Sequence, residues 1–170
     1  MMRVGPLFAA LSASLFGMMS WLSWTVLKPQ TGGLAPFDTR VLGYTLAEAQ
    51  DYLNHLDDTG RAIYLVEMRL LDTAFPIVFA CLMGWLAMQL ASWVHPWSRL
   101  MLVLPAAGYA VMDLCENALV AKLLRAGADG VTVEMVSLAS QFSVTKWLLL
   151  LVSWALLAVL WTLRSRTAQE

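Results

Sequence analysis

Four apolar segments constrain the fold of this chain most strongly, because each is long enough to cross the hydrocarbon core of a bilayer. A membrane-spanning helix needs about 20 mainly apolar residues at a rise of about 1.5 Å per residue. The segments comprise residues 6–27, 73–93, 100–121 and 147–163. We predict an all-α polytopic membrane protein, in which residues 1–170 form a single transmembrane domain and four helices make an up-down bundle.

The composition agrees with a membrane environment. Hydrophobic residues make up 59% of the chain and charged residues only 14%, which is more apolar surface than a soluble domain of 170 residues can bury. The first segment follows Arg3, as the apolar core of a signal peptide would, but it is too long and no small-x-small cleavage site follows it. We therefore expect it to remain in the mature protein as the first helix.

The longest polar segment, residues 28–61, connects the first two apolar segments. Its first half is rich in Pro and Gly, which predicts a loop. Thr45 and Glu48 then have the spacing of a capping box, in which a hydroxyl and a carboxylate satisfy free amide groups at the start of a helix. We predict an amphipathic external helix over about 46–58 that ends at Gly60. This helix either roofs the mouth of the bundle or is a solvated connector.

Basic residues in short loops and tails indicate the orientation, because they tend to stay on the cytoplasmic side. Arg3, Arg99, Arg164 and Arg166 all fall on one side of the predicted bundle. The other side has more basic residues, but most of them lie in a longer segment among Asp and Glu, where this rule is weaker. We predict a protein of the bacterial inner membrane with both termini in the cytoplasm.

The third apolar segment contains the most unusual polar residues, in the sequence Asp113-Leu-Cys-Glu116-Asn117. A charged side chain near the bilayer centre costs about 3 kcal/mol on insertion scales, so such residues usually face a bundle interior and serve a function. Residues three and four apart share a helix face, so Asp113, Glu116 and Asn117 point together. Asp113 lies about 21 Å along a helix from Arg99, which places it in the external half of the membrane.

Further polar residues fall in the same external half on the neighbouring segments. Arg69 and Asp72 stand near the external end of the second segment, and Lys146 stands at that of the fourth. We predict an acidic pocket open to the outside, widened by a bend at Pro105, where the helix lacks a backbone donor. Its candidate ligand-binding residues are Asp72, Asp113, Glu116, Asn117, Arg69 and Lys146.

Three short motifs resemble a pattern found in a family of small four-helix integral membrane proteins of bacteria and fungi that has no established activity. The motifs are Asp72-Thr-Ala-Phe75-Pro76, Asp113-x-x-Glu116-Asn117 and Lys146-Trp147. The resemblance covers about residues 45–165. It implies that the residues of the first two motifs matter as a set, and it implies no particular activity.

Three classes of function fit these residues. In the first, the pocket binds a lipid-like or other amphipathic molecule, whose polar head meets Asp113, Glu116 and Asn117. In the second, the protein is an enzyme that acts on such a lipid, with the deeper Asp113 holding a proton and Glu116 accepting one. In the third, it is a structural or assembly subunit, in which the acids pair with Arg69 and Lys146 and a stripe of Trp contacts a membrane-protein partner.

Other classes are disfavoured. The net charge of −1 provides no basic surface for nucleic acid. Cys81 and Cys115 do not form a Cys-x-x-Cys pair, so disulfide-relay chemistry is not expected. A metal site built from Asp72, Asp113 and Glu116 would favour Mg or Ca, but no His accompanies them at ligand spacing. We predict no metal and no cofactor.

Overall fold

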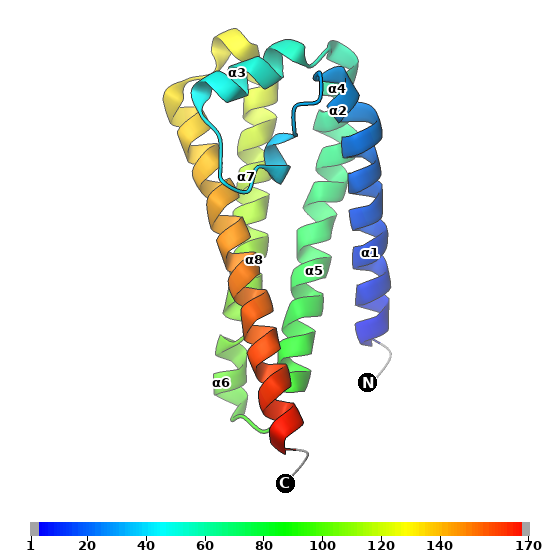
Figure 1. Cartoon of the computed structure of the whole chain (residues 1–170), viewed down its shortest axis with the longest axis vertical. Helices are drawn as coiled ribbons and strands as arrows, with labels where there is room; N and C mark the ends of the chain where they lie inside the picture. Colours follow the sequence, from blue (N-terminus) through cyan, green and yellow to red (C-terminus); the bar gives the residue numbers. More distant parts are fainter. Residues whose placement is uncertain (1–3, 168–170) are drawn as a thin grey trace.

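The computed structural model describes residues 4–167, and this part of the chain is almost entirely helical. Within it, four long helices form a bundle, and the described ends of the chain lie at the same end of that bundle (Figure 1). The helices extend over Val4–Gln30, Asp58–Leu90, Pro96–Gly130 and Val133–Arg166. Each is long and apolar enough to cross a membrane, which confirms the predicted all-α class and its four apolar helices.

Most of these long helices are composed of consecutive elements. The first comprises α1 (Val4–Leu22), η1 (Ser23–Leu27) and α2 (Lys28–Gln30), the second α4 (Asp58–Ile63), η3 (Tyr64–Met68) and α5 (Arg69–Leu90), the third α6 (Pro96–Met101) and α7 (Leu104–Gly130), and the fourth α8 (Val133–Thr167). Both η1 and η3 are π-helical turns, which occur frequently near functional sites.

The helices extend beyond the predicted apolar spans, because the apolar pattern marks only part of each helix. The second long helix begins at Asp58, well before its apolar segment begins at residue 73. Asp57 caps this start, since its carboxylate accepts a hydrogen bond of 2.6 Å from the Gly60 amide. Gly60 therefore lies in the first turn of α4, and the preceding helix already ends at His55. The prediction that Gly60 ends that helix is wrong.

Two irregularities interrupt the third long helix. Pro105 lies in the first turn of α7, directly after the break at residues 102–103 that separates α6 from α7. The helix is thus interrupted next to Pro105, and the widening of the pocket there stays a prediction. Residues 125–130 belong to α7, which is interrupted at Gly127, where the backbone φ is 68°. This left-handed conformation is one that glycine adopts without a steric penalty.

The polar connection folds back over one end of the bundle, and we call its residues 31–57 the cap. It contains η2 (Phe37–Thr39) and α3 (Leu46–His55), and it packs on α7 and α8 (Figure 1). The Thr45 hydroxyl accepts a hydrogen bond from the Glu48 amide at 3.3 Å, and the Glu48 carboxylate accepts one from the Thr45 amide at 2.7 Å. The predicted capping box is thus present.

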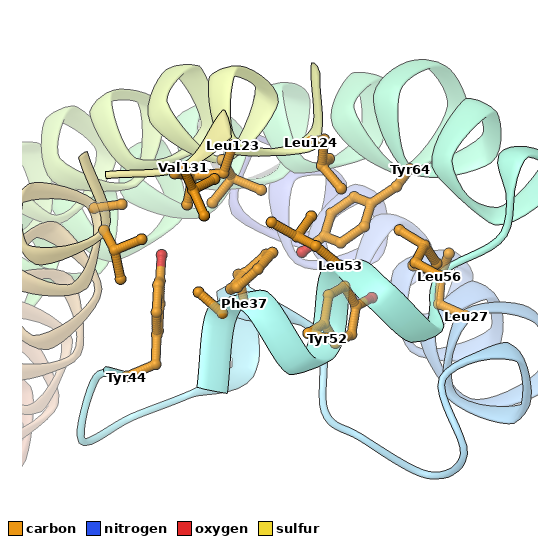
Figure 2. Packing of buried hydrophobic residues seen from close by; sticks show 14 of the residues in the cluster. Leu27, Phe37, Tyr44, Tyr52, Leu53, Leu56, Tyr64, Leu123, Leu124 and Val131 are labelled. Atoms are coloured by element: carbon orange, nitrogen blue, oxygen red, sulfur yellow. The ribbon is translucent and has the colours of Figure 1, made fainter. Parts of the chain in front are cut away.

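Aromatic side chains hold the cap against the bundle. Figure 2 shows Phe37 of the cap between Tyr44 and Tyr52, with Tyr64 of the second long helix on the Tyr52 side. The Phe37 ring centroid lies 4.9 Å from that of Tyr44 and 4.8 Å from that of Tyr52, and the Arg40 guanidinium lies within 5.6 Å of all three rings. Phe37 is fully buried. Burial also raises the pKa of the Tyr52 phenol above its ordinary value of 10.

The opposite end of the bundle is packed mainly with apolar side chains. Its buried core comprises Met83, Ala87, Leu90, Ala91, Ala106, Leu157 and Leu160. Gly84 brings two helices close together here, because a Cβ at this position would stand 3.0 Å from Val103 Cγ1. The long helices pack as α7 with α8, α5 with α7 and α8, and α1 with α5. Over their described residues, α1 and α8 make little direct contact.

Candidate functional site

A cavity of about 640 Å³ lies between α1 and α8, with α5 and α7 behind it and η2 of the cap at one end. Its walls are mainly apolar and aromatic, and they include Phe16, Trp24, Phe75, Phe79, Leu150 and Trp154. Phe16, Trp24 and Trp154 remain exposed, so the cavity opens on the side between the two helices that barely touch. In a bilayer, this opening would face lipid.

The polar end of the cavity lies beside a buried ion-pair cluster. The Lys146 ammonium of α8 is 2.5 Å from Asp113 Oδ1 and 2.5 Å from Glu116 Oε2, both on α7. The first contact is also a hydrogen bond, whereas the second is an ion pair without hydrogen-bond geometry. The Ser143 hydroxyl donates a hydrogen bond to the other Glu116 oxygen. All four side chains are buried, so this cluster holds α7 and α8 in register.

Asp72 stands apart from this cluster. Its side chain lines the cavity from α5 and is only 5% exposed. Its carboxyl group forms no hydrogen bond or ion pair with any other described residue. The nearby Arg69 neither pairs with it nor lines the cavity within the described chain. The interpretation of Arg69 and Asp72 as a salt bridge is therefore wrong, and the carboxyl group of Asp72 is left facing the cavity.

Asp38 is a site residue that the sequence predictions missed. It belongs to η2 of the cap, it is 9% exposed, and it lines the cavity together with Thr39. The Tyr64 hydroxyl donates a hydrogen bond of 2.7 Å to Asp38 Oδ1. A signal was present in the sequence, because Asp38 is the one acid between Lys28 and Thr45 and directly follows Phe37. A hydrophobic residue in a polar loop often marks the part of the loop that is buried.

The predicted ligand-binding residues thus divide into three groups. Asp72, Asp113 and Lys146 line the cavity together. Glu116 is linked to them through Lys146 but is not a lining residue. Asn117 is not a lining residue either, and its buried side-chain nitrogen has no hydrogen-bond partner in the described chain. Arg69 does not line the cavity among the described residues.

No protein-family model, no curated protein and no solved structure matches this chain. The function must therefore be argued from the site.

The chemistry of the site follows from the separation of its two ends. Most of the wall offers only apolar and aromatic atoms, while Asp38, Asp72, Asp113 and Lys146 gather at the capped end. A volume of about 640 Å³ falls within the range of about 300–1,000 Å³ that is typical of small-molecule sites. This arrangement suits a molecule with an apolar body and a compact polar head.

Proposed function

We propose that this chain is an integral membrane protein that binds one amphipathic, lipid-like molecule in the cavity between α1 and α8. The polar head would lie beside Asp72 and Asp113, and the apolar part would lie along the aromatic wall. Asp72 carries this proposal, because it is a buried carboxyl group that faces the cavity without a partner in the described chain. A buried polar group left without a partner costs about 1–3 kcal/mol, and a ligand that bound to it would recover this cost.

The opening of the cavity supports a ligand that arrives through the membrane. The exposed lining residues Phe16 and Trp154 belong to helices that are apolar enough to stand in lipid. A molecule dissolved in the bilayer would therefore enter sideways between α1 and α8. Its head would then reach the polar end, which the cap covers.

We propose further that the capped end lies outside the cytoplasm. Arg99, Arg164 and Arg166 lie at the opposite end of the bundle, where basic residues favour a cytoplasmic location. Arg3, which supports the same orientation, lies outside the described residues. The assignment to a bacterial inner membrane depends on the family resemblance alone.

Catalysis on the bound molecule is a second candidate, and Asp72 also favours it. Asp113 and Glu116, the predicted acid–base pair, both form ion pairs with Lys146. Glu116 also lies outside the cavity lining. A carboxyl group without a partner, such as that of Asp72, is freer to exchange a proton with a ligand. In this case the Asp72→Asn variant would retain a bound lipid and lose its conversion.

Native mass spectrometry of the gently solubilised protein tests the binding proposal. The wild-type protein should retain a defined small molecule, which lipid extraction would then identify. Ala13→Trp should abolish this retention, because Ala13 lines the cavity and a large side chain there would fill it. Ala10→Trp is the matched control, since Ala10 is exposed on the same helix and does not line the cavity.

Either of two results would contradict the proposal. Wild-type protein that carries no small molecule and takes up none from added lipid extract would show that the cavity is not a binding site. Equal retention by the Ala13→Trp and Ala10→Trp variants would show that a molecule binds elsewhere. In both cases the structural role of the Lys146 cluster would become the better explanation.

A further inference from the structure

The charge at the polar end of the cavity is unbalanced. Among the described residues that line it, Asp38, Asp72 and Asp113 carry carboxyl groups and Lys146 carries the one ammonium group. Lys146 is already engaged by Asp113 and by Glu116 behind the wall, at 2.5 Å from each. Lys146 is therefore already paired within the cluster. The carboxyl groups of Asp38 and Asp72 have no cation of their own among the described lining residues.

The partners of these two carboxyl groups confirm the imbalance. Asp38 receives a hydrogen bond from the Tyr64 hydroxyl, which is a neutral donor. Asp72 has no hydrogen-bond or ion-pair partner in the described chain. Lys28, whose ammonium lies 3.7 Å from the centroid of the Trp24 ring, is not a lining residue. A ligand head placed between Asp38 and Asp72 would meet two carboxyl groups that have no cation of their own.

We infer that the amphipathic ligand carries a protonated amine as its polar head, and that Asp72, assisted by Asp38, selects it over anionic and neutral heads. This inference rests on the proposed function. An ammonium group supplies donors to carboxylates and forms strong charge-assisted hydrogen bonds. A phosphate or carboxylate head would be repelled at the same place, since like charges repel strongly where water is scarce. The aromatic wall beside the polar end is also compatible with a cation, because cations are attracted to ring faces.

Binding of three matched probes tests this selectivity. Dodecylamine, dodecanol and dodecyl phosphate share one apolar chain and differ only in the head. Each is titrated into the full-length protein in phosphatidylcholine nanodiscs at pH 7, with empty nanodiscs as the blank, and binding is measured by calorimetry. The wild-type protein should bind dodecylamine at least about tenfold more tightly than either other probe, since a tenfold ratio needs only about 1.4 kcal/mol.

The Asp72→Asn variant should lower the affinity for dodecylamine about tenfold or more and leave that for dodecanol nearly unchanged. Glu67→Gln is the matched control, because it removes an acid from an exposed position of the same long helix, outside the cavity. It should change neither affinity. If the Asp72→Asn variant does not fold, Asp38→Asn provides the second variant, with an effect in the same direction.

The source of the amine is distinguished by a change of membrane. If nanodiscs that contain phosphatidylethanolamine weaken the binding of dodecylamine, the head of a membrane lipid occupies the site. If they do not, the ligand is a separate amine-bearing amphiphile.

The outcomes separate this inference from the proposal beneath it. Dodecanol or dodecyl phosphate binding as tightly as dodecylamine, or Asp72→Asn behaving like Glu67→Gln, would overturn the amine head while leaving a lipid site in place. Absence of saturable binding for all three probes, together with identical behaviour of the Ala13→Trp and Ala10→Trp variants, would overturn the proposed function as well.

Discussion

At the end of the bundle opposite the cap, α5, α7 and α8 pack through aliphatic side chains such as Ala87, Leu157 and Leu160. At the capped end, the same helices place Asp113 and Lys146 beside a cavity. The first end gains its stability from close packing. The second gives up close packing and buries charges, although a buried ion pair replaced by apolar residues is often no less stable. This difference supports the proposal that the polar end serves binding rather than stability.

The largest expected effect comes from breaking the charge cluster of the capped end. Lys146→Met would leave Asp113 and Glu116 buried without their cation, which typically costs about 3–5 kcal/mol. The free energy of unfolding, measured by chemical denaturation in mixed micelles, should fall accordingly.

A combined variant with Lys146→Met, Asp113→Asn and Glu116→Gln is the control for this prediction, because it removes the buried charges together. It should recover most of the lost stability. If Lys146→Met alone is as stable as the wild-type protein, the cluster is not the interaction that holds α7 and α8 together.

The next prediction applies one substitution at two positions of α8, one in the packed end and one in the cavity wall. Leu160→Ala removes a buried side chain from the packed end and should cost about 2–5 kcal/mol, because the neighbouring side chains cannot fill the space. Leu150→Ala enlarges a cavity that already exists, so its cost should fall well below that range. Thermal unfolding of both variants gives the comparison, and equal losses would show that the two ends do not differ in packing.

A third prediction concerns the connection between the cap and the bundle. Tyr64→Phe removes the hydroxyl that donates to Asp38 and leaves this buried carboxyl without its donor. The expected cost is about 1–3 kcal/mol, and it should fall on the cap rather than on the whole fold. Hydrogen exchange followed by mass spectrometry should show faster exchange in residues 31–57 and unchanged exchange in the packed core. Uniform acceleration along the chain would contradict this.

The sequence predicted the helices well because their cause is local. Twenty apolar residues in a row leave a chain few alternatives to a spanning helix, and the capping box depends only on the spacing of Thr45 and Glu48. The ion pair of Asp113 with Lys146 was also predictable, because a buried charge is costly unless an opposite charge on a neighbouring helix pairs with it. The Glu116–Lys146 pair, one of the structural alternatives, is present for the same reason.

An acidic pocket was predicted, but its opening between α1 and α8 could not be, because that opening depends on contacts between distant residues. The position of α1 is set by its packing on α5, where Gly5 makes room for the Trp85 ring. Asp38 reaches the site only because Phe37 is buried beneath the cap. The predicted ion pair of Arg69 with Asp72 is absent from the described chain for a related reason. The spacing of the two residues suggests a shared helix face but does not show which of them faces inward.

The smallest expected effect lies at the outer surface of the cap, far from the packed end. Hydrogen bonds from the Thr45 amide and hydroxyl hold the pKa of the exposed Glu48 carboxyl below its ordinary value of 4.5. A carboxyl group whose pKa is lowered by folding stabilises the folded state above its unfolded pKa, and this contribution is lost as the pH falls through the folded value. Thr45→Ala removes the hydroxyl but keeps the amide, so the Glu48 pKa should rise only part of the way toward 4.5. An NMR titration of Glu48 measures this shift.

Loss of the hydrogen bond that the Thr45 hydroxyl accepts at the start of α3 should also cost about 1 kcal/mol, seen as faster hydrogen exchange confined to α3. Water screens this surface contact, so the loss of stability should stay within α3. A larger loss that extended to the cavity would mean that the cap and the cavity are coupled, and that the two ends of the bundle differ in cooperativity as well as in packing.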